Sequence, residues 1–437
     1  MFETIVALAT PSLKSALAII RLSGEDCFEV VSKVFTKDLT IEPKKEIHFG
    51  YIIDGDKQID QVVLLTYVEP HSFTGENSVE IICHGSPLIA NQIISLLLKN
   101  GARMATNGEF SSRAYLNGKI DLIQAEAIND IINSTTAEAK DLSMISLKGD
   151  TSKMFKPIKE QIAEILSLIE VNIDYPEYED IEVVTKEKII AVCGEIVKNI
   201  DVLIDEGERS RLYIEGLKIA IVGKPNVGKS SLLNSLIKSD KAIVTDIAGT
   251  TRDVVEGDFN LNGIPCHLFD TAGLRESTDV IEKIGINKSV EAINNADLVI
   301  FVIDDTGLDN DLFKLVKDKK HILVTNKADL LSFKDKNALY ISAKNNDIEP
   351  LIVKIKEVMN IGDIKVKPSF NNTRQLGLLK NISNCLNTAI EDAKDDQPID
   401  LISVSIMSAY NSALDLIGEN NKNDLTDEIF SRFCVGK

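Results

Sequence analysis

The sequence has no tryptophan, and aromatic residues make up only 5% of its 437 positions. No basic run is interleaved with aromatic side chains, and the net charge is −19. Extended, unaided binding of nucleic acid is therefore disfavoured, because it needs lysine and arginine to displace phosphate counterions. If RNA is a substrate, we expect another subunit to help hold it.

Long apolar runs and paired cysteines are also missing. No apolar run reaches the roughly 18 residues of a membrane span, and residues 1–10 lack a basic leader followed by an apolar core. The six cysteines are far apart and form no CxxC pair, so neither a disulfide framework nor a zinc site is indicated. We expect a protein of the reducing cytoplasm that makes no membrane contact.

One catalytic side chain is missing from an otherwise full GTPase motif set. Leu274 follows Asp270-Thr271-Ala272-Gly273, at the position where Ras-like enzymes keep the glutamine that orients the attacking water. The set begins with a glycine-rich loop over 223–230, between an apolar run at 217–222 and a helical pattern at 231–237. Strand, glycine loop and helix in this order favour a phosphate cradle over an ordinary glycine turn.

Each motif has a chemical reason. Gly223 and Gly228 allow backbone N–H groups to turn toward phosphates, Lys229 adds a positive charge, and the Ser230 hydroxyl can bind Mg²⁺. The Asp329 carboxylate can accept two N–H donors from guanine that adenine does not offer, so GTP is favoured over ATP. The residues that these motifs predict to bind GTP are Asn226, Val227, Gly228, Lys229, Ser230, Ser231, Asp270, Thr271, Ala272, Gly273, Asn326, Lys327, Ala328, Asp329, Ser342, Ala343 and Lys344.

Periodicity changes along the chain predict a multidomain α/β and α fold. Strand-like runs and two helical patterns indicate an α+β domain over 1–119. Helical spacing, such as the stripe Ile158, Ile162, Ile165, Leu166 and Ile169, dominates 120–215 and returns in 361–437. An inserted Ras-like P-loop GTPase domain over 216–360 would therefore interrupt one helical bundle.

The whole chain resembles the MnmE family, also called TrmE, of tRNA modification GTPases. The resemblance rests on these segments: Ile20-Arg21-Leu22-Ser23-Gly24, Ser72-Phe73-Thr74-Gly75-Glu76, Gly108-Glu109-Phe110-Ser111-Ser112-Arg113-Ala114, Leu116-Asn117-Gly118-Lys119-Ile120-Asp121-Leu122, and the tail Phe433-Cys434-Val435-Gly436-Lys437. It implies a homodimer that acts with the FAD-dependent protein MnmG as a heterotetramer on the C5 position of wobble uridine in certain tRNAs. It also implies a one-carbon donor, 5,10-methylene- or 5-formyl-tetrahydrofolate, bound by the N-terminal domain, which also dimerises.

The resemblance offers a substitute for the missing glutamine. It implies a K⁺ site formed by Asn226, Thr245, Ile247 and Thr250, Mg²⁺ ligands at Ser230 and Thr251, and catalytic roles for Lys229, Asp270 and Glu282. It also implies that GTP is bound by the loop Thr245, Asp246, Ile247, Ala248, Gly249, Thr250 and Thr251. A cation beside the phosphates can stabilise developing negative charge, and a glutamate can orient water. The alternatives are that Asn226 only shapes its loop and that Glu282 is a solvated helix charge.

The same resemblance implies folate-binding roles for Arg21, Glu80, Lys119 and Lys437, and a possible reactive thiol at Cys434. Cations can pair with the folate glutamate tail, and a carboxylate can accept hydrogen bonds from the pterin edge. The alternatives are ordinary surface charges for the four residues and a small core side chain for the cysteine.

Two other functions stay open at this point. A ribosome-assembly GTPase such as Era would append a basic RNA-binding module with a GxxG loop. Residues 361–437 instead have 8 Lys+Arg against 11 Asp+Glu, a helical pattern and no GxxG. In the second alternative the chain is a folate-binding protein whose GTPase only regulates assembly.

Overall fold

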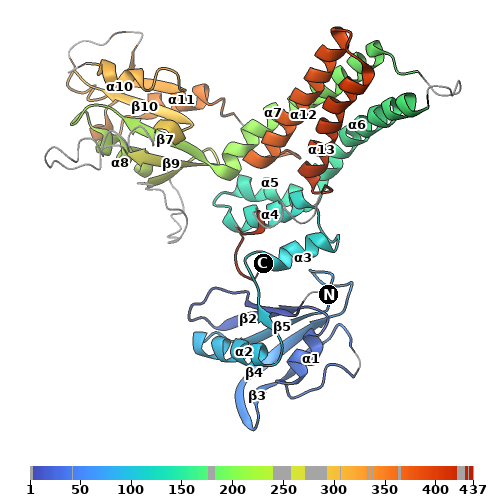
Figure 1. Ribbon diagram of the computed structural model, residues 1–437. Helices are drawn as coiled ribbons and strands as arrows, with labels where there is room; N and C mark the ends of the chain where they lie inside the picture. Colours follow the sequence, from blue (N-terminus) through green and yellow to red (C-terminus); the bar gives the residue numbers. More distant parts are fainter. Residues whose placement is uncertain are drawn as a thin grey trace. The chain divides into compact units, whose positions relative to one another are not determined.

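The computed structural model of the chain describes residues 3–41, 43–175, 183–239, 257–270, 293–305, 307–331, 335, 338–362, 366–420, 429–431 and 433–436. The chain folds into two compact units. The first contains residues 1–129, 146–160 and 410–437, and the second contains residues 130–145 and 161–409. Figure 1 colours the chain along its sequence, so the segments of each unit can be followed.

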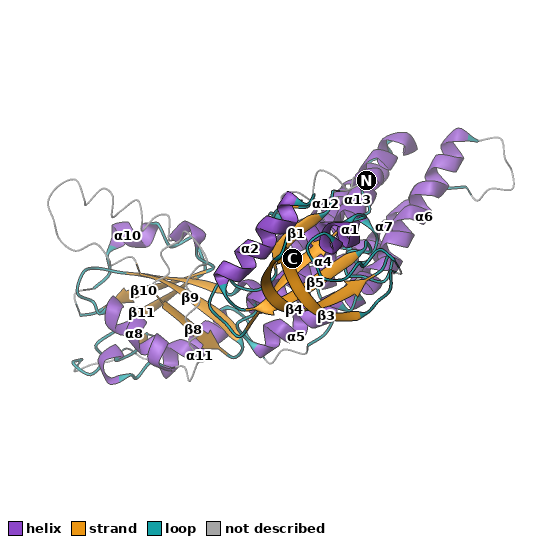
Figure 2. Ribbon diagram, turned by 90° about the horizontal axis from the view of Figure 1, so that it is seen from below, coloured by secondary structure: helices purple, strands orange, loops and turns teal. Residues whose placement is uncertain are grey.

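The first unit contains a six-stranded sheet with the order β3-β4-β5-β2-β1-β6. Only β1 and β6 pair in parallel, and the other neighbours are antiparallel. Its strands, orange in Figure 2, are β1 (Ile5–Leu8), β2 (Leu17–Ser23), β3 (Ile47–Asp54), β4 (Lys57–Tyr67), β5 (Ser78–His84) and β6 (Arg103–Met104).

Alternation along these strands decides which face of the sheet is covered. On β2, Ile20 and Leu22 are fully buried, and they share a core with α1 (Cys27–Ser32) and α2 (Pro87–Lys99). Successive strand residues point to opposite faces, so Arg21 lies on the other face. Its register partner on β5 is Glu80. The sheet therefore places these two predicted folate ligands side by side.

Helices make up most of the remaining chain outside the second sheet. They are α3 (Glu109–Leu116), α4 (Leu122–Asn133), α5 (Ala137–Leu147), α6 (Asp150–Asp174), α7 (Lys186–Glu215), α12 (Thr373–Lys394) and α13 (Ile399–Ile417). The apolar stripe predicted on α6 is confirmed, because Ile162 and Ile169 are fully buried and Ile158, Ile165 and Leu166 nearly so. Helices α7 and α12 pack together within the second unit. No helix among the described residues is long and apolar enough to cross a membrane.

The second unit contains a sheet with the order β12-β11-β10-β7-β9-β8, parallel except for the β8–β9 hairpin. Its elements are β7 (Leu217–Val222), α8 (Lys229–Ser239), β8 (Gly257–Leu261), β9 (Ile264–Asp270), β10 (Leu298–Ile303), α10 (Asn310–Lys314), β11 (His321–Thr325), β12 (Leu339–Tyr340), the 3-10 turn η1 (Ala343–Asn345) and α11 (Glu349–Val358). The carboxyl ends of its parallel strands meet at one edge, where ligands bind in such sheets.

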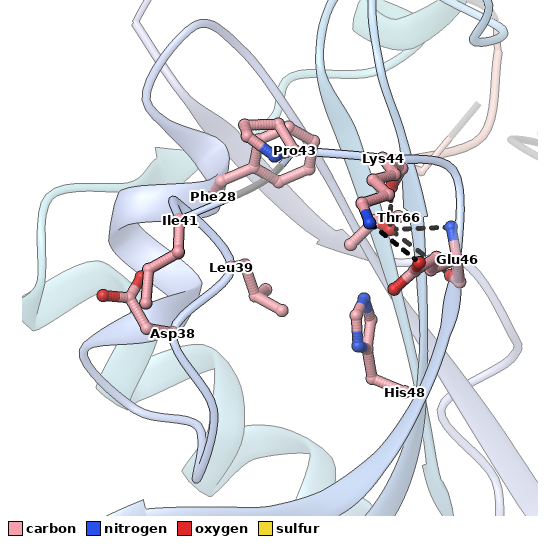
Figure 3. A pocket seen from close by; sticks show the side chains of 9 residues that line it. All are labelled: Phe28, Asp38, Leu39, Ile41, Pro43, Lys44, Glu46, His48 and Thr66. Carbon is pink, nitrogen blue, oxygen red and sulfur yellow. Dashed lines mark hydrogen bonds and ion pairs between the residues drawn. The ribbon is translucent and has the colours of Figure 1, made fainter.

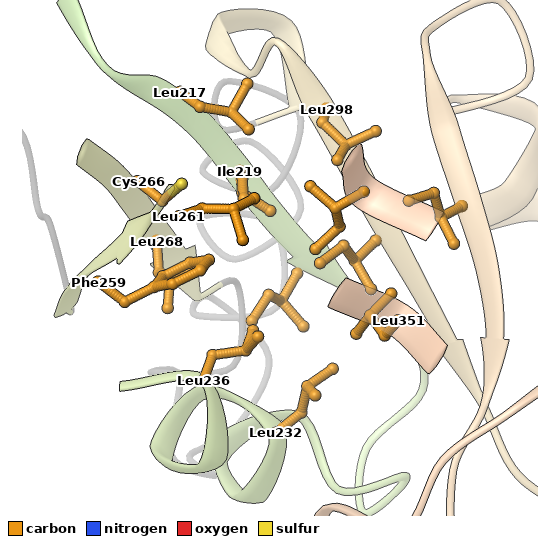
Figure 4. Packing of buried hydrophobic residues seen from close by; sticks show 14 of the residues in the cluster. Leu217, Ile219, Leu232, Leu236, Phe259, Leu261, Cys266, Leu268, Leu298 and Leu351 are labelled. Carbon is orange, nitrogen blue, oxygen red and sulfur yellow. The ribbon is translucent and has the colours of Figure 1, made fainter. Parts of the chain in front are cut away.

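The core under this sheet is continuous with helical segments of the same unit. Figure 4 shows Leu217 and Ile219 of β7 facing Leu232 and Leu236 of α8 across buried apolar side chains. Leu142 of α5 and Leu212 of α7 belong to the same cluster. Burial of each such leucine stabilises the fold by about 1.5–3 kcal/mol. The GTPase sheet therefore shares its core with helices from outside residues 216–360.

Candidate functional site

The glycine loop between β7 and α8 has the backbone that a phosphate cradle needs. Asn226 has φ 64° and Gly228 has φ 97°, in the region that side chains disfavour. A Cβ on Gly228 would lie 2.2 Å from Asn326 Nδ2, so only glycine fits there. Lys229 is nearly buried, and its Nζ donates to the carbonyls of Gly223 and Lys224, each at 2.8 Å. The ammonium is thus held by the loop itself.

The predicted base-recognition residues gather at the same edge of the sheet. Asn326, which is 3% exposed, donates from Nδ2 to the Val227 carbonyl at 2.9 Å, and its Oδ1 accepts from Ala343 N–H at 3.0 Å. The Ser342 hydroxyl donates to Asp329 Oδ1 at 2.6 Å. One buried amide therefore connects the phosphate loop to the loop after β12, and a hydroxyl orients the carboxylate expected to read guanine.

Sequence reasoning missed Asp304, which pairs with the predicted residue Lys327. Lys327 Nζ lies 2.7 Å from Asp304 Oδ2, whose side chain is only 4% exposed. Asp304 directly follows β10, and Lys327 follows the neighbouring strand β11. Parallel strands bring their carboxyl ends together, so a charged residue right after the apolar run 298–303 was the signal that could have revealed it.

Several predicted residues lie outside the described part of the chain. These are Thr245, Asp246, Ile247, Ala248, Gly249, Thr250, Thr251, Thr271, Ala272, Gly273, Leu274, Glu282 and Lys437, together with the side chain of Asp270. Ser230 and Ser231 begin α8, and Lys344 is exposed in η1. The structure therefore brings together the loop after β7 and the loops after β11 and β12, while the K⁺ site, including the role of Asn226, stays a prediction.

The residues present fit a nucleotide with Mg²⁺. The loop has positive φ at Gly228, where a Cβ would collide, and Ser230 places a hydroxyl in the first turn of a helix whose N-terminus favours anions. Ser230 would hold the ion, which would neutralise phosphate charge when bound, and Thr251, the second predicted ligand, lies outside the described residues.

In the first unit, Arg21 and Glu80 form a pair on the sheet face away from α1 and α2. Arg21 Nε and Nη2 donate to Glu80 Oε1 at 2.9 and 2.8 Å, and the side chains are 22% and 20% exposed. Arg21 Nη1 also donates to the Gly436 carbonyl at 3.3 Å. Burial and the negative charge of Glu80 raise the pKa of the nearby Tyr67. Two of the predicted folate ligands are thus adjacent, and Gly436, the last described residue of the chain, hydrogen-bonds to Arg21.

The C-terminal tail is fixed to the loop before α3. Gly108 N–H donates to the Cys434 carbonyl at 3.4 Å, Asn107 forms a bridge with Val435, and Asn107 Nδ2 donates to the Ser431 carbonyl at 3.3 Å. Cys434 itself is exposed, so the alternative of a core side chain is wrong. Within the described part of this tail, residues 429–430 are helical.

Lys119 does not contact the Arg21–Glu80 pair directly. Its Nζ donates to the Pro70 carbonyl at 2.9 Å, in the loop between β4 and β5. A separate cavity of about 300 Å³ lies beside α1, β3 and β4, and Figure 3 shows its lining side chains, among them Phe28, His48 and Thr66. None of the described residues predicted to bind GTP or folate lines it.

Comparison with protein families covers almost the whole chain. The model described as "GTP-binding protein TrmE N-terminus" matches residues 4–119, and the model described as "MnmE helical domain" matches residues 122–434. The chain belongs to the MnmE family. This membership confirms the resemblance seen in the sequence and the expectation of a GTPase.

Individual relatives match this chain over nearly all of their length. A protein of Mycoplasma mycoides subsp. mycoides SC named tRNA modification GTPase MnmE is 42% identical, over 100% of this chain and 99% of the relative. A protein of Enterococcus faecalis with the same name is 38% identical, over 100% of this chain and 98% of the relative. Among solved structures, the G domain of the FeoB iron transporter of T. maritima is 30% identical in sequence. The match covers 32% of this chain and 98% of that domain's chain, with a TM-score of 0.25.

Proposed function

We propose that this GTPase acts with the FAD-dependent protein MnmG to add a carboxymethylaminomethyl or aminomethyl group at C5 of wobble uridine in certain tRNAs, with a tetrahydrofolate as one-carbon donor. The observation that carries the proposal is a chain of the MnmE family with two separate polar sites. One is the loop set around Asn326 and Lys229, and the other is the Arg21–Glu80 pair beside Gly436.

The chemistry of the second site supports a folate. Both hydrogen bonds that Glu80 accepts from Arg21 end on its Oε1, so its Oε2 can accept a hydrogen bond from a ligand. A pterin presents N–H donors along one edge. A carboxylate accepts hydrogen bonds from these donors and so favours a ligand that has them. Lys119 and Lys437 would pair with the acidic tail of the ligand. Cys434 is exposed on the segment whose backbone is bound to Gly108, so its thiol is accessible to a bound reactant.

At the nucleotide site, we propose hydrolysis without the Ras-type glutamine. Positive charge would come from K⁺, held by Asn226, Thr245, Ile247 and Thr250. Glu282 would orient the attacking water. Two GTPase domains would meet across the loops beside their nucleotides. We place the protein in the cytoplasm, as a homodimer in a heterotetramer with MnmG, with tRNA shared between the partners.

The test is reconstitution of the purified chain with MnmG, GTP, a tetrahydrofolate and unmodified tRNA, read by mass spectrometry of the wobble uridine. The proposal expects modification that requires this chain, folate and GTP hydrolysis. Modification that proceeds equally with a non-hydrolysable GTP analogue would favour the alternative in which the GTPase only regulates assembly. Modification without added folate would contradict the donor assignment.

A further inference from the structure

Phe73 presents an aromatic ring to solvent beside the Arg21–Glu80 pair. The residue is 40% exposed, and its ring centroid lies 5.8 Å from the Arg21 guanidinium carbon. A second ring, Phe110, lies at the same distance from Arg21 but is fully buried. The guanidinium is thus within the range of cation–π contact with both rings, and only Phe73 offers ring surface to a ligand.

The loop that carries Phe73 is held in place on both sides of the residue. The Ser72 hydroxyl donates to the Glu76 carbonyl at 2.5 Å, and the buried Thr74 hydroxyl lies 2.6 Å from that of Ser23. Asn117 Nδ2 donates to the Thr74 carbonyl at 2.8 Å. Since the flanking residues are fixed, Phe73 cannot bury its ring by a local shift of the loop.

A buried charge cluster fastens the end of the same loop. Glu76 Oε2 accepts from Arg113 Nη1 at 3.0 Å and from the Ser23 hydroxyl at 2.8 Å. Arg113 is 1% exposed and also donates to Glu109 Oε1 at 2.9 Å. Charges removed from water are costly unless they are paired, so this cluster holds together as a unit. The fold therefore keeps an apolar ring exposed by means of buried polar contacts, which is the arrangement of a preformed ligand surface.

We propose that Phe73 is a stacking platform for the flat pyrimidine half of the reduced pterin whose edge Glu80 would bind. This inference rests on the proposed folate site and names a binding residue in it. Aromatic side chains stack on heteroaromatic rings through their faces, while neighbouring polar groups fix the ring's orientation. Arg21 contacts both Glu80 and Phe73, so it would hold the Glu80 carboxylate and the face of the Phe73 ring in a fixed relative position.

The test compares binding of 5-formyltetrahydrofolate to the full chain and to Phe73→Ala and Phe73→Tyr, by equilibrium dialysis. The Ala variant should bind about tenfold more weakly, as expected for loss of a stacked ring, and the Tyr variant should bind like the native chain. p-Aminobenzoylglutamate, which lacks the pterin ring, should bind all three proteins alike. Leu88→Ala is the matched control, because Leu88 is an exposed apolar residue on α2, which covers the other face of the sheet.

Arg21→Ala separates the folate site itself from the stacking role of Phe73. If the native chain does not bind 5-formyltetrahydrofolate, the proposed folate function is wrong. If the native chain binds it, Arg21→Ala loses binding, and Phe73→Ala binds normally, the folate site stands and the stacking role is overturned. A change in oligomeric state of Phe73→Ala by light scattering, with unchanged affinity, would likewise overturn it and indicate that a second copy covers the ring.

Discussion

The side-chain amide of Asn326 donates a 2.9 Å hydrogen bond to the Val227 carbonyl, so the loop after β11 is bound directly to the glycine loop after β7. The same side chain accepts from Ala343 N–H. Asn326→Ala removes two buried hydrogen bonds of about 1 kcal/mol each and leaves their partners unsatisfied. We expect at least tenfold weaker GTP binding, measured by displacement of a fluorescent guanine nucleotide. Asn345→Ala, an exposed neighbour in η1, should bind GTP normally, and equal affinities of the two variants would contradict this role.

The Asp304–Lys327 pair leads to a second prediction. Asp304→Asn keeps the shape of the side chain but removes the charge that holds the Lys327 ammonium. A hydrogen bond between charged groups is worth about 1 kcal/mol more than a neutral one, so we expect roughly fivefold weaker binding of GTP and GDP. At saturating GTP, kcat should not change, because neither residue lies in the loop that holds the phosphates. Asp305→Asn, at the exposed next position, is the control, and a fall in kcat alone would argue against a positioning role.

The nucleotide site also shows how far sequence reasoning extended. The run 217–222 was predicted as a strand and is β7 with those bounds. Such runs are visible because a buried parallel strand is apolar at every position. The Asp304–Lys327 and Asn326–Val227 contacts were not visible. The first joins the ends of the neighbouring strands β10 and β11, and the second joins the loops after β7 and β11, which meet only in the folded sheet.

The first unit had the same pattern of success and failure. One of the two helical patterns predicted within residues 1–119 is α2 (Pro87–Lys99), because Pro87 starts it and its apolar residues recur at helical spacing. The role of Arg113 was not foreseen beyond its place in a family motif. Its environment depends on Glu76 and Glu109, which approach it through tertiary packing. Local periodicity carries no information about which charges are buried together.

Hydrolysis without the glutamine gives a third prediction. K⁺ should accelerate GTP hydrolysis over Na⁺, and Asn226→Gly should remove that advantage while leaving the rate in Na⁺ unchanged. Glycine is the suitable replacement because it adopts the φ of 64° without strain, while the whole side chain with its oxygen is removed. Glu282→Ala should abolish turnover but bind GTP normally. Phosphate release in the two salts is the measurement, and equal native rates in both would rule out the cation's role.

Glu109 provides a prediction about acid stability. Burial alone would raise its pKa, but hydrogen bonds from Arg103, the Thr106 N–H and Arg113 outweigh it and lower the pKa to about 2, from an ordinary value of 4.5. A carboxyl whose pKa is lowered on folding stabilises the native state above its unfolded pKa. That contribution is lost as pH falls from about 4.5 toward 2.

The measurement is amide hydrogen exchange of residues 103–116 over this pH range, corrected for intrinsic exchange. Native protection should fall steadily with acid. Glu109→Gln should be less protected at neutral pH and should lose little more below pH 4.5, because it has no carboxyl to protonate at that site. Glu29→Gln, which removes an exposed i,i+4 pair with Lys33, should follow the native curve. A native profile that is flat with pH would contradict the assignment.

Thiol reactivity is the fifth prediction, and it bears on the proposed role of the tail. Cys434 is exposed, Cys385 is partly buried, and Cys27, Cys83, Cys193 and Cys266 are buried. Burial raises the pKa of Cys83 and Cys193 to about 11, so these thiols are neither accessible nor ionised near neutral pH.

With a chromogenic disulfide at pH 8, we therefore expect one fast thiol, a second slower one and the remaining four only after unfolding. Cys434→Ser should remove the fast phase and no other. If the tail contributes to the folate site, 5-formyltetrahydrofolate should slow the Cys434 phase in the native chain but leave the Cys385 phase unchanged. Equal slowing of both would indicate a general change in accessibility, whereas no slowing would place the thiol outside the bound ligand's reach.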